Sequence, residues 1–114
     1  MKITEYKFLK EYIPLTNKFI QYDKKLESIK NDIQKYVQVK LMGEYNPHYI
    51  VGMSSIKRAG LDKDKKYLAM KKLESKYRKI VDNYINLIDN WEIDFYKKYS
   101  YEEFLKLKKI YQSQ

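Results

Sequence analysis

Residues 43–60, with the sequence GEYNPHYIVGMSSIKRAG, separate two long segments whose apolar residues recur every three or four positions. This stretch holds all three glycines of the chain, whereas the segments on either side hold none. A glycine-containing stretch between two amphipathic segments is typical of a connector between helices. We therefore predict a helical hairpin, with helices over 16–42 and 61–96 joined by a connector over 43–60.

The apolar positions of both segments predict one packed face per helix, because steps of three and four residues stay on one side of an α-helix. In the first segment they are Phe19, Tyr22, Leu26, Ile29, Ile33, Tyr36, Val37 and Leu41. In the second they are Met70, Leu73, Tyr77, Ile80, Tyr84, Leu87 and Trp91. The second segment carries a further apolar set, Val81, Ile85, Ile88 and Phe95. One partner helix does not cover both sets, so the terminal helices or a second copy must, and we expect a homodimer.

Two shorter helices are predicted at the ends of the chain. The first covers 3–13 and is stopped by Pro14, after which Thr16 is expected to cap the next helix. The second covers 100–111, where Ser100 and Glu103 have the spacing of a capping box. The predicted fold is therefore all-α: residues 1–114 form one small helical bundle, a long antiparallel, coiled-coil-like hairpin with short N- and C-terminal helices.

Composition excludes several classes of protein. With 114 residues, no cysteine and one histidine, the chain has neither disulfides nor a common zinc site, and we expect no metal or other cofactor. The segment before Pro14 lacks the apolar core of a signal peptide, and no apolar run could span a bilayer, so we expect a cytoplasmic protein without membrane contact. His48 has no evident catalytic partner, and the carboxylates of 89–94 are spread around a helix, so we expect no enzyme.

The net charge of +9 is concentrated in one region. Residues 57–79 hold ten basic residues against three acidic ones, a local balance of +7. Four of the lysines fall on one narrow helical face beside the apolar seam: Lys65, Lys72, Lys76 and Lys79. Such a stripe can follow a phosphate backbone, with Tyr49, Tyr67 or Tyr77 stacking on bases.

The candidate nucleic-acid-binding residues are these four lysines together with Arg58 and Arg78. Only two of the 24 basic residues are arginines, which favours contact with phosphates over readout of base edges. Two alternatives stay open: a lysine face that is only solvated, and an acidic protein partner. Part of the lysine excess also fits the amino-acid usage of an A+T-rich genome.

The connector is longer than the roughly 2 to 8 residues that usually join packed helices. Its apolar residues either cover the end of the hairpin or form a loop that binds a partner. The candidate partner-binding residues are Tyr45, Tyr49 and Met53.

The order of a basic helix, a linker with GMSS at 52–55 and the basic segment YLAMKKLESKYRKIVDNYINLID at 67–89 resembles phage-encoded late transcription regulators of the ArpU and RinA type. The resemblance covers residues 20–90 and implies a mobile-element origin in a bacterial host. In that family a helix-turn-helix follows the hairpin and recognises DNA, whereas here one capped helix follows Trp91. No functional residue of the family is therefore carried over.

Two functions of different classes follow from these patterns. The first is a non-catalytic regulatory protein of a phage or mobile element, which contacts the backbone of nucleic acid or of a host nucleoprotein through the lysines. The second is a phage anti-defence inhibitor, similar in role to an anti-CRISPR protein, which binds a host nuclease or its guide RNA complex.

Overall fold

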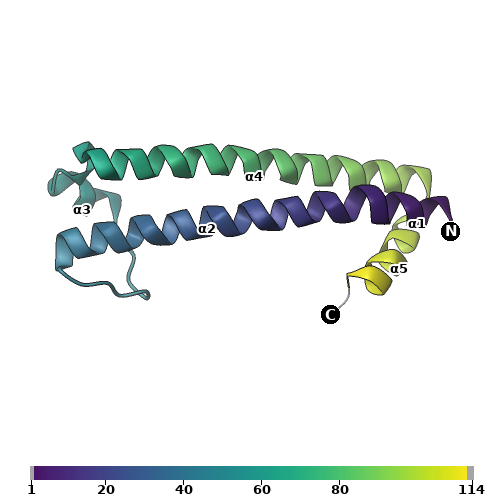
Figure 1. The fold of residues 1–114 in the computed structure, drawn as a ribbon, viewed down its shortest axis with the longest axis horizontal. Coiled ribbons are helices and arrows are strands. Elements are labelled where there is room, and N and C mark those ends of the chain that lie inside the picture. Colours follow the sequence, from purple (N-terminus) through teal and green to yellow (C-terminus); the bar gives the residue numbers. More distant parts are fainter. Residues whose placement is uncertain (1, 113–114) are drawn as a thin grey trace. The chain divides into compact units, whose positions relative to one another are not determined.

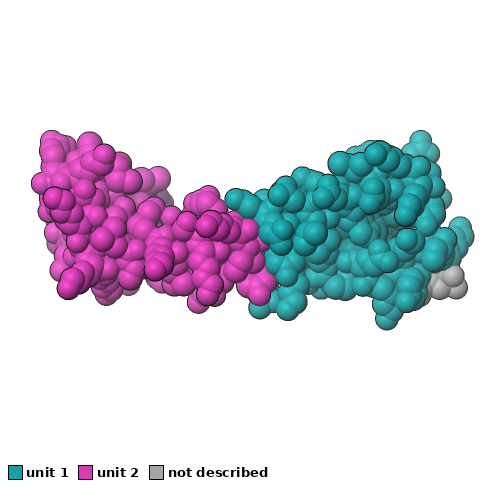
Figure 2. Space-filling model, turned by 90° about the horizontal axis from the view of Figure 1, so that it is seen from above, with its two compact units in different colours: residues 1–21, 81–114 teal, residues 22–80 magenta. Residues whose placement is uncertain are grey.

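The computed structural model describes residues 2–112, and within that range the regular elements are helices and no strand occurs. The chain forms two compact units (Figure 2). Unit 1 comprises residues 1–21 and 81–114, and unit 2 comprises residues 22–80. The all-α prediction is confirmed.

Two long helices, α2 (Ile13–Met42) and α4 (Lys65–Lys98), pack as the predicted hairpin (Figure 1). In unit 2 their facing sides enclose a core together with parts of the connector. Its buried members are Ile29, Ile33, Val37, Val51, Ile56, Leu61 and Tyr67. Burying an aliphatic or aromatic side chain of this size contributes roughly 1.5–3 kcal/mol, so this cluster is the main source of stability in unit 2.

The first helix does not stop at Pro14, which corrects the sequence prediction. α1 (Ile3–Lys7) continues through one π-helical turn (Phe8–Tyr12) directly into α2. The π turn widens the backbone just before Pro14, so the helix accommodates the proline ring and its missing N–H without ending there. Thr16 is not an N-cap, since its hydroxyl donates to the carbonyl oxygen of Ile13 at 3.0 Å.

The packed face of α4 is shifted from the predicted one. Tyr67, Val81 and Phe95 are buried, whereas Leu73 and Leu87 are 42% and 43% exposed. The seam follows Tyr67, Met70, Glu74, Tyr77, Val81, Tyr84, Ile88, Trp91 and Phe95. These positions again alternate in steps of three and four, so the apolar set that had been assigned to a second stripe belongs largely to the seam itself.

Glycine conformations mark the two ends of the connector. Gly43 has a φ of +81°, and its N–H donates to the carbonyl oxygen of Val39 at 2.9 Å, which ends α2 as predicted. Gly60 has a φ of +73° and leads into a 3-10 turn over Leu61–Lys63. Residues with a side chain rarely adopt such values, so both glycines are needed where they stand.

The connector itself has two halves. Its second half contains a helix that the sequence did not predict, α3 (Met53–Arg58), and buries Val51 and Ile56 in the core of unit 2. Its first half, residues 43–50, is exposed at every position. The covering role that the sequence offered as one alternative therefore applies to the second half only.

Unit 1 has an aromatic core where α5 (Tyr101–Tyr111) meets the ends of the other helices. Its buried members are Phe8, Tyr12, Phe95, Phe104 and Leu107. The predicted cap of α5 is confirmed, because the Ser100 hydroxyl oxygen accepts the backbone N–H of Glu103 at 3.0 Å. A cap of this kind stabilises a helix by about 1 kcal/mol.

A buried tyrosine makes unit 1 sensitive to alkali. Burial, and then the hydrogen bond that the Tyr12 hydroxyl donates to Glu92 Oε2 at 2.7 Å, raise the pKa of Tyr12 well above its ordinary value. Burial and the charge of Glu92 also raise the pKa of Tyr96 to about 12. A raised tyrosine pKa gives stability that is fully present below the unfolded pKa of about 10 and is lost as the pH rises through the folded value.

We therefore expect the free energy of unfolding to fall above about pH 10. The Tyr12→Phe variant should show a shallower fall, because its ring carries no hydroxyl to ionise. Urea titrations between pH 9 and pH 12 measure this, with Tyr6→Phe, an exposed tyrosine of the same unit, as the control. An equally steep fall in Tyr12→Phe and in the unchanged chain would contradict the assignment.

Candidate nucleic-acid interface

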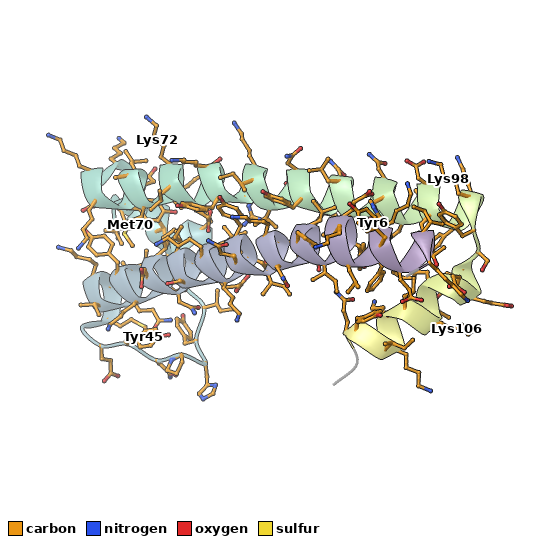
Figure 3. The ribbon with its side chains drawn as sticks, turned by 45° about the vertical axis from the view of Figure 1, so that its right-hand side comes forward. Tyr6, Tyr45, Met70, Lys72, Lys98 and Lys106 are labelled. Atoms are coloured by element: carbon orange, nitrogen blue, oxygen red, sulfur yellow. The ribbon has the colours of Figure 1, made fainter. Side chains whose placement is uncertain are left out.

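Four of the six predicted nucleic-acid-binding residues share one exposed face of α4, called the lysine face below: Lys65, Lys72, Lys76 and Lys79. A residue two positions further along a helix lies about 200° further round its axis. Tyr67, two positions after Lys65, is buried. The side chain of Glu74, two positions after Lys72, is only 14% exposed. The lysine face therefore lies opposite the seam and not, as predicted, beside it. Figure 3 shows Lys72 pointing away from α2.

No carboxylate in the described part of the chain forms an ion pair with the lysine face. Within residues 2–112 two ion pairs form, and they involve other lysines: Lys30 with Glu27 at 3.3 Å and Lys71 with Glu74 at 2.8 Å. The 14 steps from position 65 to position 79 extend about 21 Å along the helix axis. This length is sufficient for several phosphates of one strand, each of which an ammonium group could contact as a point charge.

Neither predicted arginine belongs to this face. Arg78 is exposed but precedes Lys79 by one residue, so it lies about 100° round the axis on another side of α4. Arg58 is exposed at the end of α3. We therefore restrict the candidate interface on α4 to the four lysines.

The three tyrosines that the sequence offered as stacking platforms do not lie on the lysine face. Tyr67 is buried in the core of unit 2. Tyr77 packs in the seam, with its ring centroid 6.2 Å from that of Tyr22. Tyr49 belongs to the exposed loop after α2, which Figure 1 shows on the side of α2 away from α4.

Gln38 holds this loop in place, and sequence analysis had not singled it out. The side chain of Gln38 is 1% exposed; its amide nitrogen donates to the carbonyl oxygen of Tyr49, and its oxygen accepts the N–H of Asn46 at 2.7 Å. Gln34, one turn earlier, accepts the N–H of Val51 at 3.4 Å. A glutamine beside Val37 and Val39 gives no sequence signal of such a role.

The predicted partner-binding residues lie in this region and are open to solvent. Tyr45, Tyr49 and Met53 all have about half of their surface exposed, and Ile50 between them is 77% exposed. Large apolar side chains exposed together are typical of surfaces that meet another molecule. Because the loop and the lysine face lie on different sides of unit 2, we treat them as separate surfaces.

The start of α4 is fixed by Asp64. The Asp64 carboxylate accepts the N–H of Tyr67 at 2.9 Å and the hydroxyl of Tyr36, on α2, at 2.9 Å. These two hydrogen bonds hold the pKa of Asp64 below its ordinary value. They tie the first turn of α4 to α2 and so determine where Lys65 and Lys66 project.

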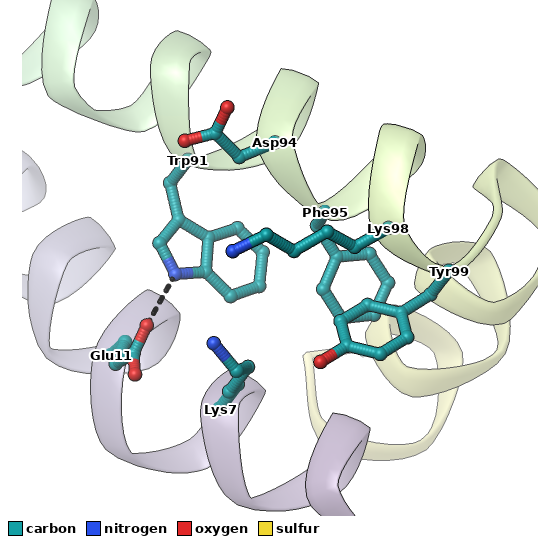
Figure 4. A pocket seen from close by; sticks show the side chains of 7 residues that line it. All are labelled: Lys7, Glu11, Trp91, Asp94, Phe95, Lys98 and Tyr99. Atoms are coloured by element: carbon teal, nitrogen blue, oxygen red, sulfur yellow. Dashed lines mark hydrogen bonds between the residues drawn. The ribbon is translucent and has the colours of Figure 1, made fainter.

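Unit 1 has a small pocket of about 90 Å³ beside Trp91 (Figure 4). Two lysines and two carboxylates surround it, Lys7 and Lys98 with Glu11 and Asp94. The Trp91 indole N–H donates to Glu11 at 3.0 Å, and the indole ring stacks on Phe95 with centroids 5.1 Å apart. The balanced charges and small volume indicate that Trp91 anchors two helices to each other.

The carboxylates of residues 89–94 do not form a metal site. Glu92 accepts hydrogen bonds from Tyr12 and Tyr96, and within residues 2–112 no cluster of three or more histidine, aspartate and glutamate side chains could hold an ion. None of the helices in that range has the length and apolar character required to cross a bilayer. Comparison of the chain with family models, with curated proteins and with solved structures finds no match.

Proposed function

We propose that this chain is a non-catalytic nucleic-acid-binding accessory protein that contacts phosphates through the lysine face. The observation that supports this most strongly is the row of four exposed ammonium groups on one side of α4, none of which forms an ion pair with a carboxylate of residues 2–112. A row that merely keeps a protein in solution needs no common face, whereas phosphate contacts along a strand do. The resemblance to ArpU and RinA type regulators favours a phage or mobile-element origin and a regulatory role; self-association stays a prediction.

Salt dependence is the first test of this proposal. Each lysine–phosphate contact releases counterions, so four contacts predict that the logarithm of the association constant falls against the logarithm of salt concentration with a slope of about −3. Fluorescence anisotropy with labelled single-stranded and duplex oligonucleotides, between 50 and 200 mM salt, measures the slope. Affinity that does not change over this range would refute phosphate binding.

Charge reversal on the lysine face is the second test. The variant Lys72→Glu/Lys76→Glu/Lys79→Glu removes three contacts and repels phosphates. We therefore expect affinity to fall about 100-fold or more, and the slope of affinity against salt to become as shallow as about −1 or shallower. The side chains are exposed, so the helical circular dichroism should be retained. The matched control Lys10→Glu/Lys18→Glu/Lys106→Glu has the same net charge but changes exposed lysines of unit 1. Equal losses in both variants would assign binding to net charge and not to this face.

A further inference from the structure

A groove between α2 and α4 opens on unit 2, with a volume of about 400 Å³. Its lining residues are Asp32, Lys35, Tyr36, Val39, Lys66 and Met70. The lining covers two turns of α2 and little more than one turn of α4, so the groove is about 10 Å long. Figure 3 shows Met70 on the side of α4 that faces α2.

The floor of the groove is apolar and is not covered by any other described part of unit 2. Val39, in the last turn of α2, is a large apolar residue that is 45% exposed. Met70 and Tyr36 are half-buried and pack against the core of unit 2 with their inner sides. A flat apolar ligand could therefore replace water on this floor.

The rim of the groove is cationic. The Lys66 ammonium lies 4.9 Å from the centre of the Tyr36 ring, and that of Lys40 lies 5.6 Å from it. Lys35 lines the groove as well, against one lining carboxylate, Asp32. The neighbouring Asp64 carboxylate accepts two hydrogen bonds and keeps its negative charge, so three lysines stand against two carboxylates around the groove. The groove thus combines an apolar floor with an excess of positive charge at its edge.

We propose that this groove takes a nucleobase from a single strand whose phosphates lie along the lysine face, an inference that rests on the proposed function. A nucleotide has the required chemistry, because it joins a flat apolar ring to an anion. Lys65 and Lys66 are adjacent and lie 100° apart on α4, so one helical turn directs one ammonium to the outer face and the next to the groove. In a duplex the bases are paired and stacked, and the groove cannot reach them.

The test compares two single strands with the same phosphates, a twelve-residue thymidine strand and a twelve-residue strand of abasic sugar-phosphates. The unchanged chain should bind the thymidine strand about tenfold more tightly, the gain expected from one base contact of this kind. Val39→Glu, which places a carboxylate on the floor, should bind both strands equally. Leu105→Glu is the matched control, because Leu105 is also 45% exposed on a helix but lies on α5 of unit 1.

The outcomes separate the two proposals. Equal binding of both strands by the unchanged chain overturns the groove as a base site while phosphate binding stands. A thymidine preference that persists in Val39→Glu, or that Leu105→Glu also loses, assigns the preference to another surface and overturns the inference as well. If neither strand binds at low salt, the proposed function itself fails.

Discussion

Phe8→Ala is expected to destabilise unit 1 by about 4 kcal/mol, the usual cost of truncating a fully buried phenylalanine. Phe8 has no exposed surface. Its ring centroid lies 5.0 Å from that of Tyr12 and 6.0 Å from that of Phe104, so the truncation leaves a cavity between the π turn and α5. A small helical unit with a total stability of 5–15 kcal/mol loses a large fraction of it.

Trp91 provides a local signal for this measurement. It is the only tryptophan of the chain, it belongs to unit 1, and its ring centroid lies 6.4 Å from that of Phe8. Urea unfolding followed by tryptophan fluorescence should show a lower midpoint in Phe8→Ala. Tyr6→Ala, which truncates an exposed ring on the preceding turn, should change the midpoint little. Unfolding of Phe8→Ala at the same urea concentration as the unchanged chain would contradict the buried aromatic core.

The helices, the cap of α5 and the end of α2 could be predicted from local sequence. The Ser100 cap and the helix-ending Gly43 were identified because a capping serine or a glycine with positive φ acts on its own neighbours. The break at Pro14 was predicted wrongly, because proline ends a helix only where the backbone cannot adjust, and here a π turn provides the adjustment.

The register of α4 could not be read from apolarity alone. Two heptad sets compete on this helix, and the set that contains Leu73 appeared better than the set that contains Glu74. In the structure Tyr67, Val81 and Phe95 of the second set are buried, and Glu74 is tolerated among them because its carboxylate keeps Lys71 as a partner 2.8 Å away. A long charged side chain can lie along a packed face while its charged end reaches a partner, so one charge does not exclude a seam position.

The lysine face could be predicted from the sequence of one helix, whereas the groove depends on how two helices pack. The four lysines share one helix, so their common face follows from helical periodicity alone. The groove joins Tyr36 and Lys66, which are 30 residues apart in sequence, and their contact depends on how α2 packs on α4. The buried role of Gln38 likewise depends on a loop conformation that no local pattern specifies.

Gln38→Glu is expected to destabilise unit 2 by at least about 3 kcal/mol at neutral pH, although the two side chains have nearly the same shape. Gln38 is 1% exposed, and its amide nitrogen donates to the carbonyl oxygen of Tyr49. A carboxylate at this position places an acceptor against an acceptor and buries a negative charge. Because the exposed loop is held through this contact, we also expect faster backbone hydrogen exchange over residues 43–50.

The pH dependence of this variant identifies the lost donor. Burial without a donor raises the folded pKa of the new carboxyl above its unfolded value of about 4.3, so the folded state takes up a proton as the pH falls through that raised value. The protonated acid again donates to the Tyr49 carbonyl oxygen, and the stability difference from the unchanged chain should shrink between neutral pH and about pH 4.5. Gln34→Glu is the matched control, because Gln34 is half-buried and its oxygen accepts from Val51, a bond that a carboxylate keeps. Chemical unfolding across this pH range should therefore separate the two variants; a difference that does not change with pH would show that Gln38 acts through packing alone.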